Sequence, residues 1–184
     1  GEWSNGVDVD QYSQISLDNS TLSSALGNGL NLNGNSKGHV RHSTIQSTYS
    51  DQWGGNAVDI SHGSEISFNH DDRYSPNLIT LSAPSFPLKA RENGKIHLNT
   101  IMSLTSTDNW DPLRLERNSR LYLNNLGDSQ ALTLGKINAG QNSWIGISGE
   151  FKGQLSQVDL HGGAVMEIWK DCEPDDTCTP TQTT

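Results

Sequence analysis

Acidic and basic side chains occupy matched places in repeated segments of the sequence, where they could bind a metal ion or transfer a proton. The column consists of Asn31, Asp59, Lys89, Arg114, Asn138 and Asp159. Alternation along a strand would direct all of these side chains outward. A carboxylate in this row could bind calcium or activate water, while a basic side chain could remove a proton. The alternative is a solvated ladder of opposite charges, which we favour because no second carboxylate column accompanies it.

Two segments between the repeats combine carboxylates with an aromatic ring, a chemistry that suits carbohydrate or protein partners. The ring offers rigid apolar area, and the carboxylates accept hydrogen bonds from hydroxyls or basic side chains. We therefore expect ligand-binding sites here, against the alternative that Tyr74 and Trp110 fold back as lids on their own loops. The candidate residues are Asp71, Asp72, Arg73 and Tyr74 in one segment, and Asp108, Asn109, Trp110 and Asp111 in the other.

Metal and nucleophile chemistry have weaker support in the sequence. Paired aspartates such as Asp71 and Asp72 lack the ligand periodicity of an EF-hand, and the histidines are scattered. We predict no catalytic residue, no metal and no cofactor. Cys172 and Cys178 enclose a short acidic segment, and a disulfide between them is favoured over free thiols if the protein is outside the cytosol.

An internal repeat specifies the elements that must position these side chains. Each copy reads apolar, any, apolar, two polar residues, Asn or Gly, a small residue, and a second alternating pair. The copies begin at Leu30, Val58, Leu88, Leu113, Ile137 and Val158, so the starts lie 28, 30, 25, 24 and 21 residues apart. This interval is typical of a solenoid coil and shorter than a propeller blade of about 40 residues.

The sixth position of each copy predicts a sharp turn. Asn and Gly are the residue types that most readily take the left-handed conformation, and the following residue is always small, as stacked turns require. The turn residues are Asn35, Gly63, Asn93, Asn118, Asn142 and Gly163. We further expect Asn93, Asn118 and Asn142 to stack as an internal ladder whose amides bond to adjacent backbone.

Alternation on both sides of the turn predicts an all-β fold, a right-handed parallel β-helix of about six to seven coils. It directs Val58, Ile60, Ile66 and Phe68 inward, while Asp59, Ser61 and Ser67 face water. A leucine-rich repeat is the alternative at this spacing, but the return limb lacks a helical or Leu-Asn signature. The third face of each coil would come from short strands at 78–81, 102–104 and 132–134, and the connections 69–77, 82–87 and 105–112 should protrude.

The expected organisation is an irregular first coil at 1–29, the β-helix at 30–170 and a polar tail at 171–184 that carries the two cysteines. An open solenoid exposes a strand edge at each end, and the sequence has no helical cap there. We therefore expect further coils before or after this segment in a longer protein.

Composition excludes some partners. The chain of 184 residues is only 32% apolar and carries a formal net charge of -9, too acidic to neutralise nucleic acid phosphates or an anionic membrane surface. No apolar run approaches the roughly 20 residues needed for a membrane span. Low hydrophobicity with high charge can mean disorder, but the alternating apolar pairs argue against it.

The repeats Val-Asp-Ile-Ser-His-Gly-Ser-Glu-Ile-Ser-Phe at 58–68 and Leu-Arg-Leu-Glu-Arg-Asn-Ser-Arg-Leu-Tyr-Leu at 113–123 resemble those of autotransporter passenger domains. These are surface β-helices of Gram-negative bacteria, and the resemblance covers roughly residues 30–169. It implies type V secretion, export through the outer membrane and surface display. The serine-protease motif of some relatives is absent, because Gly127-Asp128-Ser129 continues with Gln130.

With this resemblance, we expect a non-enzymatic binding module of a surface adhesin. Its partner would be a host protein or glycan, or an identical molecule on another cell. One alternative is a polysaccharide lyase or hydrolase of the β-helix type, including phage tailspikes, which would use residues such as Asp59 and Lys89. The other alternative is a passive stalk of a secreted protease.

Overall fold

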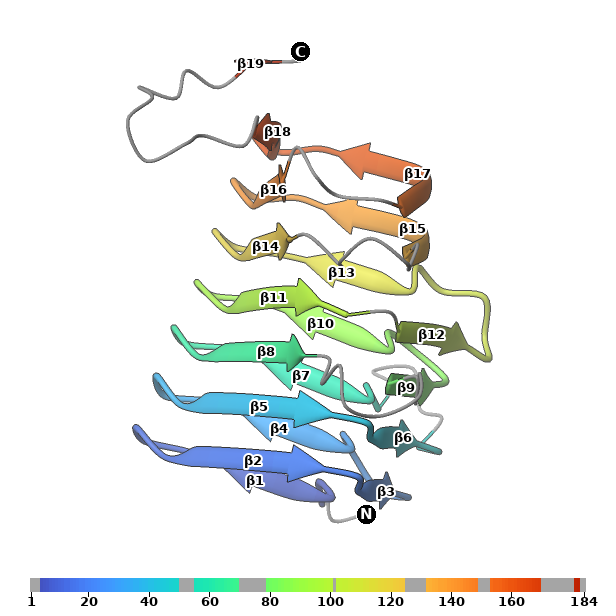
Figure 1. Ribbon diagram of the computed structural model, residues 1–184. Coiled ribbons are helices and arrows are strands. Elements are labelled where there is room, and N and C mark those ends of the chain that lie inside the picture. Colours follow the sequence, from blue (N-terminus) through green and yellow to red (C-terminus); the bar gives the residue numbers. More distant parts are fainter. Residues whose placement is uncertain are drawn as a thin grey trace.

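The computed structural model describes residues 4–49, 55–69, 79–100, 102–124, 132–148, 153–169 and 181–182. Within these ranges every regular element is a β-strand, and the strands wind into stacked coils. Figure 1 shows the chain rising from coil to coil, with β2 and its successors in front and β1 and its successors behind, in a right-handed sense. The predicted all-β, right-handed parallel β-helix is therefore confirmed.

Three sheets form the faces of the solenoid. The seven-stranded sheet contains β1 (Val7–Val9), β4 (Leu30–Leu32), β7 (Val58–Ile60), β10 (Leu88–Ala90), β13 (Leu113–Leu115), β15 (Leu132–Ala139) and β17 (Gly153–Leu160). The eight-stranded sheet contains β2 (Gln14–Asp18), β5 (Lys37–Arg41), β8 (Glu65–Asn69), β11 (Lys95–Asn99), β14 (Arg120–Leu123), β16 (Trp144–Ser148), β18 (Val165–Trp169) and β19 (Thr181–Gln182). The four-stranded sheet contains β3 (Thr21–Ser24), β6 (Thr44–Ser47), β9 (Ile79–Ala83) and β12 (Met102–Ser106). All pairs are parallel except β18 with β19.

The repeat register of the sequence is the register of the seven-stranded sheet. The first residue of each copy pairs with the first residue of the next, from Leu30 with Val58 up to Ile137 with Val158. The pairing also extends one coil down, because Val7 pairs with Leu30. Residues 1–29, expected to be irregular, thus include a coil with three strands, β1 to β3, in register with the coil above.

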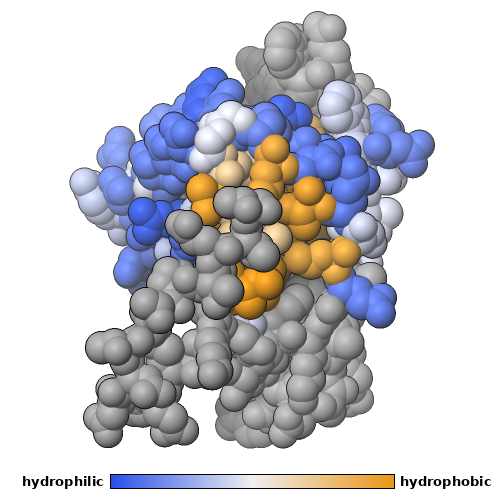
Figure 2. Space-filling model, turned by 90° about the horizontal axis from the view of Figure 1, so that it is seen from above, coloured by the Kyte–Doolittle hydropathy of each residue, from blue (hydrophilic) through white to orange (hydrophobic). Residues whose placement is uncertain are grey.

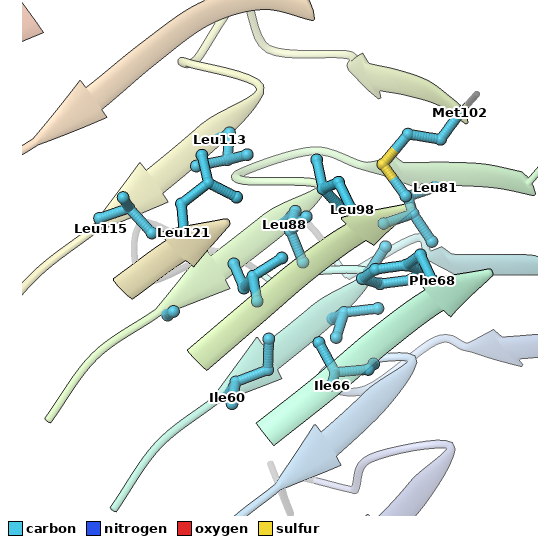
Figure 3. Packing of buried hydrophobic residues seen from close by; sticks show 14 of the residues in the cluster. Ile60, Ile66, Phe68, Leu81, Leu88, Leu98, Met102, Leu113, Leu115 and Leu121 are labelled. Atoms are coloured by element: carbon cyan, nitrogen blue, oxygen red, sulfur yellow. The ribbon is translucent and has the colours of Figure 1, made fainter. Parts of the chain in front are cut away.

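The core fills the space between the sheets. Val58, Ile60, Ile66 and Phe68 are fully buried, as the alternation predicts. Figure 3 shows Ile60 and Ile66 of one coil pointing into the interior with Leu88 from the strand of the next coil. Each such side chain contributes about 1.5–3 kcal/mol by leaving water. The stacked apolar columns therefore supply most of the energy that holds neighbouring coils together.

The turn between the seven-stranded and eight-stranded sheets has the same backbone in successive coils. All six residues at the predicted turn position have positive φ, from 61° at Asn142 to 81° at Gly163. The residue before each is also left-handed, as at Glu92 (φ 54°) and Arg117 (φ 53°). In each such pair of left-handed residues that lies below another coil, the N–H of the second one donates to a carbonyl in the turn of the next coil. An example is Asn93 N, which donates to Arg117 O at 3.0 Å. The turns stack at one edge of the solenoid (Figure 1).

The asparagine ladder lies elsewhere than predicted. Asn93, Asn118 and Asn142 are exposed, because the left-handed turn directs their side chains away from the core. The small residue after the turn is the one that points inward, and Ser143 is 1% exposed with its hydroxyl donating to Gly140 O at 2.7 Å. Half-buried amide ladders do occur at the far end of the same strands, where Asn99 donates to Asn69 Oδ1 at 2.8 Å and Asn124 donates to Asn99. The amide ladder is thus built from a different set of asparagines, which lie half-buried on the outer face.

Two further expectations about connections are wrong. Residues 132–134 do not form a strand of the third face, because they run directly into β15 and pair with β17 in the seven-stranded sheet. Residues 82–87 do not protrude: Ser82 and Ala83 belong to β9, and Pro84 to Pro87 are buried. Of residues 105–112, Thr105 and Ser106 continue β12, and Thr107 to Trp110 are exposed.

The C-terminal end of the stack exposes part of its core columns. Leu160 and Ile168, which stand above the buried Ala139 and Ile147, are 42% and 45% exposed. Figure 2 views the molecule from this end and shows apolar residues surrounded by a hydrophilic rim. The rim is formed by outward-facing side chains, whereas the apolar centre continues the interior columns.

Candidate ligand-binding groove

The charged row predicted on the seven-stranded sheet is in register, but its charged side chains form ion pairs with neighbouring residues outside the row. Asp59 pairs with Lys89 and Lys89 with Arg114 across adjacent strands. Asp59 is only 5% exposed, a correction to the prediction that it faces water. The Arg91 side chain lies over it, with Nε 3.4 Å from Asp59 Oδ1, and Asn56 donates to its other oxygen at 3.3 Å. Burial raises the pKa of Asp59, against the opposing effects of Arg91 and Lys89.

The rest of the row is a network of ion pairs. Lys89 Nζ lies 3.7 Å from Glu116 Oε2, and Arg114 contacts the same carboxylate. At the upper end, Lys136 Nζ lies 2.7 Å from Asp159 and 3.3 Å from Asp111, and these hydrogen bonds raise the pKa of Lys136. Ser61, also expected to face water, is 2% exposed, and its hydroxyl donates to Asn33 Oδ1 at 3.2 Å. The arrangement is that of a structural charge ladder.

The loop that carries Trp110 folds back onto the same sheet. The Trp110 ring packs edge-on against Phe86, with centroids 5.5 Å apart, and the Arg114 guanidinium lies 4.8 Å from the Phe86 centroid. Trp110 remains 51% exposed, while Asp108 and Asn109 are exposed. The other predicted site, Asp71, Asp72, Arg73 and Tyr74, and the pair Cys172 and Cys178 lie outside the described residues.

A groove with a volume of about 630 Å³ lies on the outer face of the eight-stranded sheet, next to the stacked turns. Its lining consists of Asn93, Lys95, Asn118, Arg120, Tyr122, Asn142, Trp144 and Glu167. Parallel pairing positions these side chains in columns: Lys95, Arg120 and Trp144 stand in one. The three asparagines line the groove from successive turns, because the turn geometry directs their side chains outward.

Aromatic rings occupy the second outward column of the eight-stranded sheet, and those that line the groove form its floor. The rings of His97 and Tyr122 are parallel within 2° at 4.4 Å between centroids, and Trp144 follows at 5.1 Å from Tyr122. Gly146 pairs with Tyr122 and has no side chain, and a Cβ there would lie 2.0 Å from the Trp144 ring. Trp144 therefore lies across Gly146 and continues the aromatic row by one coil.

The two ends of the groove carry opposite charges. Lys95 and Arg120 lie one above the other, and within the described part of the chain neither forms an ion pair. Glu167 stands at the other end, beyond Gly146 in the aromatic column. Burial lowers the pKa of His97, whose Nε2 lies 3.2 Å from Glu65 Oε1, and its ring stacks on Tyr122 just outside the lining of the groove.

The sequence interpretation missed this groove, although the repeat contains a signal for it. His97, Tyr122, Gly146 and Glu167 share one offset from the start of their copies. An aromatic pair in an outward column, followed in the next coil by a glycine that leaves room for a ring, could have indicated a surface site.

Comparison with known proteins gives no relative for this chain: no family model, curated protein or solved structure matches it. Among the residues that the structure describes, no helix is both long and apolar enough to cross a membrane. Function must therefore be inferred from the groove itself.

Proposed function

We propose that this chain is a non-catalytic binding module that recognises a saccharide chain in the groove of its eight-stranded sheet. The observation that carries this proposal is the juxtaposition of the Tyr122 and Trp144 rings with the exposed amides of the stacked turns. The resemblance of the repeats to autotransporter passengers supports export through the outer membrane of a Gram-negative bacterium. In that setting the module acts as an adhesin at the cell surface.

A saccharide suits both kinds of side chain in the groove. Sugar rings have apolar faces that stack on aromatic rings, and the rigid rings lose little conformational entropy when they bind. Hydroxyl groups accept and donate hydrogen bonds, and an Asn amide offers both functions. The amides recur at each coil, a spacing of about 4.8 Å that is comparable with the length of one sugar unit.

Display on a surface makes modest affinity sufficient. Many copies of the module on one cell would engage a polymeric glycan together, so that avidity exceeds the affinity of each groove. The long flat sides of the solenoid are also suited to contact with an identical molecule, which is the other form of adhesion expected from the resemblance.

Binding to a panel of oligosaccharides, measured by calorimetry, tests the proposal. We expect Tyr122→Ala and Trp144→Ala each to weaken binding about tenfold, which corresponds to about 1.4 kcal/mol of lost ring contact. Tyr12→Ala is the matched control, because Tyr12 is 77% exposed in the turn of the first coil, away from the groove.

Circular dichroism and thermal unfolding verify that the variants keep the fold. Equal affinity of the Tyr122→Ala and Tyr12→Ala variants for every bound oligosaccharide would remove the groove as the binding site. No binding by the unmodified protein to any member of a broad panel would remove the saccharide proposal as a whole.

A further inference from the structure

We propose that the saccharide is anionic, and that its carboxylate or sulfate groups bind Lys95 and Arg120. This inference rests on the proposed function and specifies the ligand class of the same groove. It follows from how the solenoid otherwise uses its cations, from the position of these two side chains, and from the carboxylate at the opposite end of the groove.

Arg120 differs from every other arginine that the structure describes. The other four each contact a carboxylate: Arg41 with Asp18, Arg91 with Asp59, Arg114 with Glu116, and Arg117 with Glu92. Arg120 has no such contact within the described ranges, although the chain carries nine more acidic than basic residues. A protein with this excess of carboxylates nevertheless leaves the guanidinium in the groove free to bind an external anion.

Lys95 adds a second unpaired cation directly beside the first. The two residues pair across β11 and β14. Their side chains therefore extend from adjacent strands, and such strands are about 4.8 Å apart. Like charges at directly opposed positions destabilise a sheet. Glu65 stands opposite Lys95 on β8, but its carboxylate contacts His97 and forms no ion pair with Lys95 or Arg120 in the described chain. An anionic group bound between them would remove the repulsion, and the planar guanidinium can donate two parallel hydrogen bonds to a carboxylate or sulfate.

The position of the cations matches a sugar stacked on the rings. Along β14, Arg120 lies between the exposed amide of Asn118 at the turn and the ring of Tyr122. A sugar whose face lies on Tyr122 therefore presents its ring substituents to Arg120 and Lys95 on one side. An acidic peptide could satisfy the cations, but it would leave the aromatic floor and the repeated amides without a regular partner.

Glu167 restricts where negative charge can be placed. It stands on β18, two strands above Tyr122 in the same column, at the end of the groove opposite Lys95. Its carboxylate accepts hydrogen bonds from sugar hydroxyls and repels a second anion. The groove thus favours a chain whose charged groups are spaced apart over one that is charged at every unit.

Calorimetry with matched pairs of ligands tests this assignment on the intact chain. Oligogalacturonate and its methyl ester share one backbone and differ in charge, while dextran sulfate and dextran separate sulfate from neutral glucan. We expect at least a tenfold preference for one of the charged members over its neutral counterpart, and a weaker preference at high salt. Which pair shows it distinguishes a carboxylated from a sulfated ligand.

Charge variants locate the contact. Lys95→Gln and Arg120→Gln should each reduce affinity for the charged ligand about tenfold and leave affinity for the neutral ligand unchanged. Lys37→Gln is the matched control, because Lys37 stands in the same column two coils below Lys95 and outside the groove. Glu167→Gln should increase affinity for uniformly charged oligogalacturonate several-fold.

The outcomes separate this inference from the proposed function. Equal binding of charged and neutral members, still dependent on Tyr122, would overturn the anionic assignment and retain the saccharide groove. Equal losses in Lys37→Gln and Arg120→Gln would also overturn it. Binding of poly-glutamate with no binding of any saccharide would overturn both proposals, because the groove would then bind an acidic peptide.

Discussion

Individual charged residues have two different environments on this solenoid. In the row on the seven-stranded sheet, Asp59 is buried and contacts Arg91, and Lys89 and Arg114 share Glu116. In the groove on the eight-stranded sheet, Arg120 and Lys95 face outward without such contacts in the described chain. The sequence alone could not separate the two, because both sets occupy outward positions of a repeat.

Asp59 should make stability depend on pH. Its pKa is raised in the folded chain because burial disfavours the carboxylate, so the folded state keeps a proton that the unfolded state releases. Stability is then lost as pH rises from the unfolded pKa, about 3.9, through the higher folded value. Asp59→Asn, which cannot ionise, should gain thermal stability relative to the unmodified protein over this rise in pH.

Differential scanning calorimetry between about pH 4 and pH 7 measures this difference. Asp8→Asn provides the comparison, since Asp8 stands in the same column of the sheet and is exposed. A melting temperature of Asp59→Asn that falls in parallel with that of the unmodified protein would show that the buried carboxyl does not control the pH dependence.

At the scale of elements, the turn, the strand register and two strands of the third face, β9 and β12, could be predicted from the sequence, whereas the place of residues 132–134 could not. Asn or Gly at one offset identifies a backbone that few other residues adopt, and the structure has positive φ at all six positions. Strands of the third face carry no such constraint, so residues 132–134 were misassigned although their apolar pair resembles that of β12. The second left-handed residue was also missed, because types such as Glu92 and Arg117 give no signal for it.

The turn backbone predicts the effect of a substitution at Asn35. Its φ of 62° is tolerated by Asn and Gly but strained for a β-branched residue, so Asn35→Val should destabilise the fold by about 1–2 kcal/mol. Asn35→Gly should change the free energy of unfolding by much less. Urea unfolding measures both, and similar losses in the two variants would contradict this account of the turn.

At the scale of the whole molecule, the solenoid converts matched offsets in the sequence into columns in space. His97, Tyr122 and Glu167 are far apart along the chain, yet parallel pairing aligns them on one face. The same stacking leaves Trp110 on the seven-stranded sheet, packed against Phe86. The loop that carries Trp110, one of the two segments favoured as binding sites in the sequence, is therefore separate from the groove that the fold assembles.

The most direct test of the groove is an NMR titration of the ¹⁵N-labelled chain with the oligosaccharide that calorimetry shows to bind most tightly. The indole signals of Trp144 and Trp110 are assigned from Trp144→Phe and Trp110→Phe variants. We predict that the Trp144 signal shifts in proportion to bound ligand while the Trp110 signal stays in place. A shift of the Trp110 signal with no change at Trp144 would contradict the account and assign binding to the loop instead of the groove.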